Sequence, residues 1–256
     1  MNPSLVTVFA ASALLTASSG VAQTPARPAA PAQKAVVSDI TTPIGCAPQA
    51  VSTPPAATIR VRNGQEPTKY LFGTNDGIVL TAGSAQGVAV GQEYFVRRVV
   101  PDRFTVPMSD GTIPISIHTA GWVRVVDVQS DAAIAIVTNA CDGVMQGDYL
   151  EPFTPPGNPG APTAAGTPDF ANPAHIVLGD ERRQVGGQGS LMVIDAGSDR
   201  ALKGGQRLTI YRNSGGGTIV TVGDAAVVTV YPGTSLVRIL SSHDAVYVGD
   251  LIAIHR

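Results

Sequence analysis

The stretch TAGSAQGVAVGQEYFVRR, residues 81–98, decides the fold, because the chain repeats it as DAGSDRALKGGQRLTIYR, residues 195–212. The Ala-Gly-Ser, Gly-Gln and final Arg letters of the two copies coincide without a gap, at one offset of 114 positions (82 to 196). An internal repeat fixes the architecture before any single motif is interpreted. Residues that the copies share are therefore expected to build the scaffold, and function is expected where the copies differ.

The second halves of the copies align at an offset of 102 positions (121 to 223), where GWVRVVDV matches GDAAVVTV. Short apolar or alternating runs recur between turn signals, which is typical of the strands of a small barrel or sandwich. We therefore predict an all-β fold with two tandem barrel-like or sandwich-like domains related by an internal repeat. We interpret His175–Gly179 as the counterpart of Tyr70–Gly73.

The domain boundaries follow from composition. An apolar run near the N-terminus is followed by small residues, as in a secretory signal with a cut after Ala22. Stretches rich in Pro, Ala and Gly indicate a tether and a linker. The predicted segments are a signal peptide (1–22), a disordered tether (23–57), a first domain (58–152), a linker (153–174) and a second domain (175–256).

The change of offset means that the first copy carries twelve more residues than the second (114 against 102), within Val99–His118. A second loop, Asp180–Gly189, is also longer than its counterpart. Inserted loops on a rigid scaffold are frequent binding elements. These two segments are therefore candidates for contacts with a partner.

Composition excludes several classes of function. Only 14% of the residues are charged and the net charge is −2, without the basic excess that nucleic-acid binding requires. The N-terminal apolar run is too short for a membrane span, so none is expected in the mature chain. The four histidines lack metal-ligand spacing, and no phosphate-binding loop or nucleophile elbow occurs. We expect no metal, no cofactor and no nucleic-acid partner.

Two cysteines, Cys46 and Cys141, remain in an exported chain, and an even count favours a disulfide bridge. Two unpaired thiols are the alternative, because the sequence does not give the distance between them. Cys141 aligns with His243, so the thiol belongs to the first copy alone. A bridge would hold the N-terminal tail against the first domain.

Asp195 is the sharpest catalytic candidate, since Val193–Ser198 is similar to the Asp-Thr-Gly motif of aspartic proteases. That reaction needs two aspartates that share a proton, and the first copy has Thr81 at the equivalent position. A homodimer with two Asp195 residues is the remaining catalytic hypothesis. The repeated aspartates Asp148 and Asp250 are expected to accept hydrogen bonds from turn amides.

Several side chains that the copies do not share are candidate partner contacts. Trp122 aligns with Asp224, which indicates a solvent-facing position, although the ring could instead pack under the inserted hairpin. Neighbouring arginines are expected on a solvated face. The full set of candidate contacts is Trp122, Arg97, Arg98, Arg103, Phe104, Arg182 and Arg183.

Each repeat unit resembles a small β-barrel module of bacterial envelope assembly proteins. The shared pattern is a small-residue turn, a G-V-x-x-G segment, a G-x-V-x-V strand and a closing Gly-Asp, which this chain has at 82–84, 87–91, 121–125 and 147–148. The second copy departs from it with Ala201 in place of the first glycine. The likeness extends to the C-terminal domain of flagellar assembly protein T, to a region of LysM-containing envelope proteins and, more loosely, to MreC.

The resemblance implies a non-catalytic scaffold or assembly protein that is exported to the periplasm, with an association with the outer membrane or cell wall left open. Its partners would be an envelope protein or a second copy of the chain. A peptidoglycan-binding or glycan-binding module is the alternative function, although no LysM repeat is present in the sequence.

Overall fold

The structure is a computed structural model that describes residues 44–101, 106–157, 160–180 and 183–256. The predicted signal peptide and the first part of the predicted tether lie outside these residues. The strands of the first half are β1 (Gln49–Val51), β2 (Val61–Gly64), β3 (Leu71–Phe72), β4 (Gly77–Leu80), β5 (Glu93–Val100), β6 (Ile115–Val128), β7 (Ala133–Ala140), β8 (Val144–Met145) and β9 (Tyr149–Pro152). Those of the second half are β10 (Pro168–Gly179), β11 (Val185–Gly186), β12 (Leu191–Ile194), β13 (Arg207–Ser214), β14 (Thr218–Val230), β15 (Ser235–Ser242), β16 (Val246–Tyr247) and β17 (Leu251–His255).

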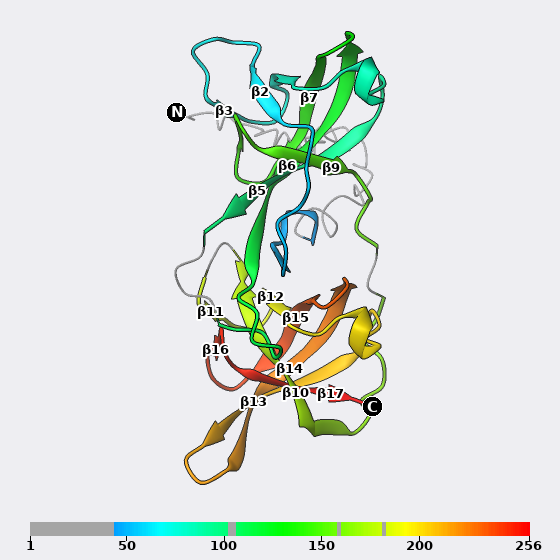
Figure 1. Cartoon of the computed structure of the whole chain (residues 1–256). Coiled ribbons are helices and arrows are strands. Elements are labelled where there is room, and N and C mark those ends of the chain that lie inside the picture. The colour runs from blue at the N-terminus through cyan, green and yellow to red at the C-terminus, as the bar shows by residue number, and fades with distance from the viewer. Residues whose placement is uncertain (1–43, 102–105, 158–159, 181–182) are drawn as a thin grey trace, which may run out of the picture. The chain divides into compact units, whose positions relative to one another are not determined.

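The second half forms a closed barrel in which the strands follow the order β10-β12-β15-β14-β13-β17 (Figure 1). The first half has the same order, β2-β4-β7-β6-β5-β9, with β1 added to the edge of β6. Its first and last strands are joined by hydrogen bonds from Val61 N to the Asp148 carbonyl (2.8 Å) and from Leu150 N to the Ile59 carbonyl (2.9 Å). The prediction of an all-β chain with two barrel-like repeats is confirmed.

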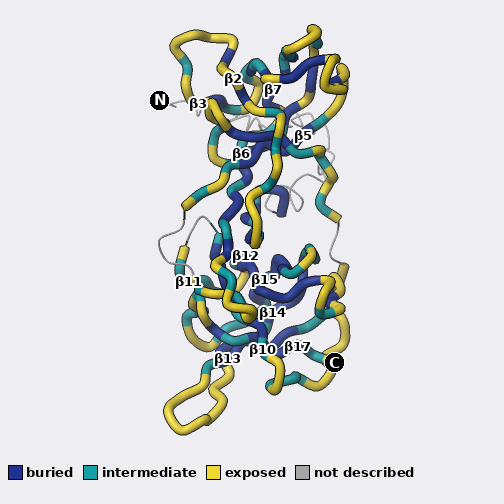
Figure 2. The backbone as a smooth tube through the Cα atoms, viewed as in Figure 1, coloured by how far each residue is buried: buried dark blue, intermediate teal, exposed yellow. Residues whose placement is uncertain are grey.

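Each barrel has its own apolar core, because inward-facing residues alternate along the strands. The first core includes Ile78, Leu80 and Val96, all fully buried. The second includes Ile194 and Ile210, and the buried residues form a separate cluster. Figure 2 shows the buried strands as dark blue and the exposed turns between them as yellow.

The repeated turn has the same backbone in both copies. A 3₁₀ turn at Ser84–Gln86 ends at Gly87 with φ +83°, and the equivalent turn at Ser198–Arg200 ends at Ala201 with φ +58°. Ala201 therefore adopts the left-handed conformation that glycine holds in the first copy. The next residue of the first copy, Val88, is buried in the core.

One predicted correspondence is wrong. Ile176 pairs with Ile194 just as Val61 pairs with Leu80, so the counterpart of His175–Gly179 is Arg60–Gly64. Tyr70–Gly73 contributes instead to β3, which pairs with β8. The structural counterpart of β3 is β11, which pairs with β16 in the second half.

The predicted tether also ends too late. The structure places β1 within its residues, paired in antiparallel fashion with Ile115–Ile117 of β6. Ile44, Ala47 and Ala50 in this segment are buried, at 5%, 5% and 2% exposure. The sequence did not reveal this segment, because its few apolar residues pack against strands of the second barrel, which lie far along the chain.

Candidate functional site

A disulfide bridge holds the segment that precedes the first barrel. Cys46 and Cys141 are bonded with their Cα atoms 5.6 Å apart, within the usual range for a disulfide. Cys141 directly follows β7, and β1 begins three residues after Cys46. We call residues 44–51 the clasp. The sequence-based prediction of this bridge is confirmed.

The clasp is attached to the first barrel but buries its apolar side chains against the second. Its residues Ile44, Ala47 and Ala50 belong to one buried cluster with residues on the strands of the second barrel. The Thr234 hydroxyl donates a hydrogen bond to the Ala50 carbonyl at 3.1 Å. The members from the second barrel are Val177, Leu178, Leu191, Val193, Val228 and Leu236.

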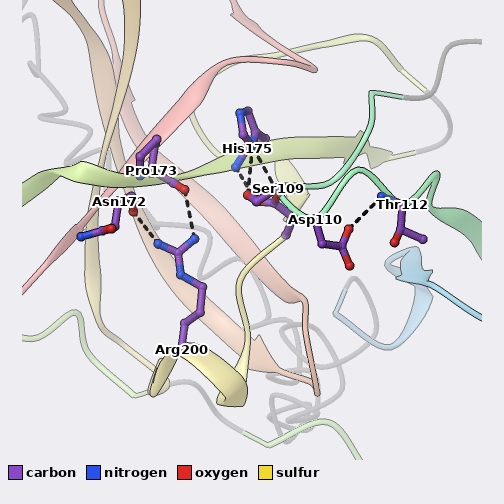
Figure 3. Close-up of polar contacts among 8 residues, drawn as sticks. Ser109, Asp110, Thr112, Asn172, Pro173, His175 and Arg200 are labelled. Carbon is purple, nitrogen blue, oxygen red and sulfur yellow. Dashed lines mark hydrogen bonds and ion pairs between the residues drawn. The ribbon is translucent and has the colours of Figure 1, made fainter.

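A polar latch joins the inserted hairpin of the first repeat to the second barrel (Figure 3). It consists of Ser109, His175 and Asp195. The amide and the hydroxyl of Ser109 both donate to Asp195 Oδ2, each at 2.5 Å. The amide of His175 donates to Asp195 Oδ1, also at 2.5 Å. The buried carboxylate of Asp195 therefore binds one strand of its own barrel and the tip of a hairpin from the other repeat.

The latch contains the residue types of a catalytic triad but not the geometry. In a triad the imidazole lies between aspartate and serine and uses a different ring nitrogen for each. Here His175 Nδ1 lies 3.2 Å from both Ser109 Oγ and Asp195 Oδ2, and the serine is bonded directly to the carboxylate. The Asp195 side chain is 0% exposed. Its contacts are those of a structural anchor.

A broad surface pocket of about 790 Å³ lies beside the latch, and Ser109, His175, Arg200 and Arg256 are among its lining residues. The Arg200 guanidinium is held by the backbone carbonyls of Pro173, at 3.0 Å, and of Asn172 (Figure 3). Arg200 thus binds the backbone in the middle of β10, where the register of β10 against β17 shifts between Asp169 and Ala174.

Arg97 and Trp122 do not lie on an open solvated face, contrary to the sequence-based expectation. Arg97 is 5% exposed, forms an ion pair with Glu151 at 2.9 Å and stacks over the Phe95 ring at 4.4 Å. Trp122 is partly buried, with ring centroids 6.1 Å from Phe95 and 5.7 Å from Phe153. The indole ring also approaches the backbone of the clasp, since a Cβ on Gly45 would meet it at 3.1 Å.

Arg98 belongs to an ion pair that is repeated in both barrels. Its guanidinium binds both carboxylate oxygens of Asp148, at 2.6 and 2.7 Å. Arg212 binds Asp250 in the same way, at 2.6 and 2.9 Å. Hydrogen bonding to the carboxylate raises the pKa of each arginine above its ordinary value.

The two aspartates of these ion pairs also fix a turn in each barrel. Asp148 accepts a hydrogen bond from the amide of Met145, and Asp250 accepts one from the amide of Tyr247, each at 2.8 Å. The predicted role of these aspartates as acceptors for turn amides is confirmed.

The remaining candidate contacts are placed only in part. Arg103, Phe104 and Arg182 lie outside the described residues. Arg183 lines a pocket of about 320 Å³ together with Gln188 and Arg238. This pocket lies in the Asp180–Gly189 loop, which the sequence had marked as longer than its counterpart.

Sequence reasoning missed Ser109 and His175. Two features of the sequence could have indicated them. The second copy has Asp195 where the first has Thr81, and only the first copy has the inserted hairpin that contains Ser109. Nothing in the sequence indicates a contact between Ser109 and Asp195, which are 86 positions apart.

Neither a protein-family model nor a curated protein sequence matches this chain. Within the described ranges, no group of three or more His, Cys, Asp or Glu side chains is placed to hold a metal ion. No helix in the part of the chain that the structure describes is both long enough and apolar enough to cross a membrane.

Proposed function

We propose that the chain is an exported, non-catalytic scaffold or assembly protein of the bacterial cell envelope that works through protein–protein contacts. The observation that carries the proposal is an exposed apolar cross-strand pair at the same place in each barrel. Leu71 faces Met145 in the first barrel, with 56% and 42% of the residues exposed. Val185 faces Tyr247 in the second, with 45% and 44% exposed.

These pairs are equivalent by the offsets of the repeat, since residue 71 corresponds to 185 and residue 145 to 247. Single exposed apolar side chains are ordinary, but contiguous apolar surface favours a binding role. In the first barrel Tyr70, adjacent to Leu71, is 73% exposed and enlarges the surface. We call these two surfaces the exposed pairs.

The polar contacts support a scaffold in another way. Asp195, His175 and Ser109 are residue types that occur in catalytic sites. Here their hydrogen bonds connect the inserted hairpin of the first repeat to the second barrel. The ion pairs of Arg98 and Arg212 are likewise internal.

The compartment is part of the proposal. The disulfide between Cys46 and Cys141 supports export, because such bridges persist in oxidising compartments such as the periplasm. The resemblance of each repeat to envelope assembly modules points in the same direction.

Site-specific photocrosslinking in the native cell tests this function. A benzophenone amino acid replaces Leu71 or Val185 in the full chain, and adducts formed on irradiation are identified by mass spectrometry. Val90, a 65% exposed valine outside the exposed pairs, is the matched control position. We expect adducts with one or a few envelope proteins from Leu71 or Val185 and none of these from Val90.

The same adducts from all three positions, or no protein adduct from any, would contradict the proposal. Retention of the purified chain on insoluble peptidoglycan without protein adducts would favour a glycan-binding module instead.

A further inference from the structure

One hairpin of the second barrel extends beyond the strands that flank it. β13 pairs with β17 only over Leu208–Tyr211, and β14 pairs with β15 only from Gly223 onward. The remaining ends of β13 and β14 pair with each other, up to Ser214 and Thr218. Figure 1 shows this hairpin as an orange loop that projects from the barrel, and Figure 2 shows its tip as exposed.

The equivalent hairpin of the first barrel has its edge covered. There β1 adds to β6, with Gln49 opposite Ile117 and Val51 opposite Ile115. The offset of 102 carries residues 115–117 to 217–219, at the start of β14. Among the described residues no strand pairs with this edge of β14 before Gly223. The repeat therefore has one covered edge and one open edge, and we call Thr218–Thr221 the open edge, since the carbonyl of Val222 already accepts a hydrogen bond from the amide of His243 at 2.8 Å.

The composition of the open edge favours strand pairing. Its sequence, Thr-Ile-Val-Thr, consists entirely of β-branched residues and has no charge and no proline. Ile219 is 43% exposed and Val220 is 48% exposed. Exposed edges are usually protected from association by charged residues, proline or bulges. The open edge has no charged residue and no proline, and the register shift of β14 against β13 lies beyond it, at Val222.

We propose that the open edges of two copies of this chain pair with each other as antiparallel strands. A two-fold axis at Val220 sets Val220 of each copy opposite Val220 of the other and Ile219 opposite Thr221, because residues related by such an axis keep the same face of the sheet. Residues directly opposite in an antiparallel pair lie on the same face of the sheet, so one face gains a Val–Val contact and the other gains two Ile–Thr contacts. Both exposed apolar side chains are covered at once. The edge is thus complementary to itself, as a two-fold interface requires.

The charge nearest to the open edge does not oppose this pairing. Arg212 lies opposite Val220 on β13. Its guanidinium is already paired with Asp250 at 2.6 Å and with Asp244 at 2.8 Å. Two copies can therefore approach without bringing unpaired arginines together. This inference does not depend on the proposed envelope function, since it concerns the purified chain alone.

Sedimentation velocity of the purified full chain over a range of concentrations tests the pairing. We expect a reversible monomer–dimer equilibrium. The double variant Ile219→Lys/Val220→Lys sets the lysines at position 220 of the two copies directly opposite each other and removes both exposed apolar side chains, and like charges directly opposite destabilise a strand pair. It is expected to raise the dissociation constant by at least about tenfold, equivalent to about 1.4 kcal/mol. Val126→Lys, which replaces a valine of similar exposure (46%) in β6, is expected to leave the constant unchanged.

A charge-complementary mixture separates edge pairing from a general loss of folding. An equimolar mixture of the Lys/Lys variant with Ile219→Glu/Val220→Glu is expected to form heterodimers, while each variant alone stays monomeric. The proposal is overturned if the wild-type chain is monomeric at every concentration, which would leave the edge to a strand from a different protein. It is equally overturned if the Lys/Lys variant dimerises like the wild type, or if the mixture does not associate.

Discussion

The two copies of the repeat differ most instructively at Thr81 and Asp195, which hold the same place in the same turn. In the first copy the Thr81 hydroxyl accepts a hydrogen bond from the amide of Arg60 at 2.9 Å. In the second copy Asp195 Oδ1 accepts one from the amide of His175. A hydroxyl has a single oxygen, whereas a carboxylate has two. The second oxygen of Asp195 is the one that binds Ser109.

A second difference lies on the outer walls of the barrels. The first barrel carries Phe95, Trp122 and Phe153 in mutual contact. The offsets of 114 and 102 place Thr209, Asp224 and His255 at the equivalent positions of the second barrel. Residues shared by the copies thus build each barrel, and residues that differ determine what packs on its outside.

The largest expected effect comes from the disulfide, which only the first barrel has. Its half-cystines are 95 positions apart, and closure of a loop of about 100 residues stabilises a fold by about 4.7 kcal/mol in the chain-entropy treatment. Cys46→Ala/Cys141→Ala should lower the free energy of unfolding of the first barrel by about that amount. Denaturant unfolding measures it, and reductant should shift the wild type but not the variant.

Loss of the repeated ion pair, in contrast, should lower the free energy of unfolding equally in both barrels. Asp148→Ala and Asp250→Ala each leave an arginine and a turn amide without the acceptor. Removal of one partner from a buried pair costs about 3 kcal/mol. Unfolding of the single and double variants by denaturant should give matching and additive losses. A loss of unfolding free energy in only one barrel would contradict a shared scaffold role. Asp131→Asn, at an exposed position, is the control.

Exchange of the differing turn residues sharpens the comparison further. Asp195→Thr keeps an acceptor for the amide of His175 but removes the one for Ser109, at an expected cost of about 2 kcal/mol. Hydrogen exchange of the Ser109 amide should accelerate accordingly. The reciprocal Thr81→Asp lies at an exposed position and should change stability by less than about 0.5 kcal/mol. Unchanged exchange in Asp195→Thr would show that other contacts hold the hairpin.

The smallest effect concerns pH. Burial lowers the pKa of His255 below its ordinary value of 6.5, while Asp224 opposes the shift. The folded state then binds the proton less readily than the unfolded state. The contribution of His255 to stability is therefore full above pH 6.5 and is lost as the pH falls below it. His255→Phe, which installs the residue of the first copy, should reduce the difference in unfolding free energy between pH 7.5 and pH 5.

The sequence predicted the elements that the copies share. The two offsets placed the turn glycines and the arginine and aspartate of each ion pair on equivalent positions. These residues are repeated because each barrel must build the same turns. The disulfide was favoured from the cysteine count, although only the structure gives the distance between the two residues.

The counterpart of β10 could not be found from the sequence, for a physical reason. Val177 and Leu178 are buried under the clasp, whereas Arg62 and Asn63 at the equivalent positions are exposed. Because the clasp packs on the outside of β10, that strand has apolar residues at positions where β2 has polar ones. The two strands therefore show no similarity in sequence. The latch escaped prediction because Ser109 lies in an insertion that has no counterpart.

The bridge between Cys46 and Cys141 also sets an order of events during biosynthesis. The thiol of Cys46 leaves the ribosome 95 residues before its partner, and β2, β4, β5, β6 and β7 are all made in the interval. The clasp can be sealed only when the strand that precedes Cys141 has been completed. The disulfide can therefore form only after most of the first barrel has been synthesised. If Cys46 is oxidised with another thiol before then, the bridge to Cys141 does not form and the clasp is not held against β7.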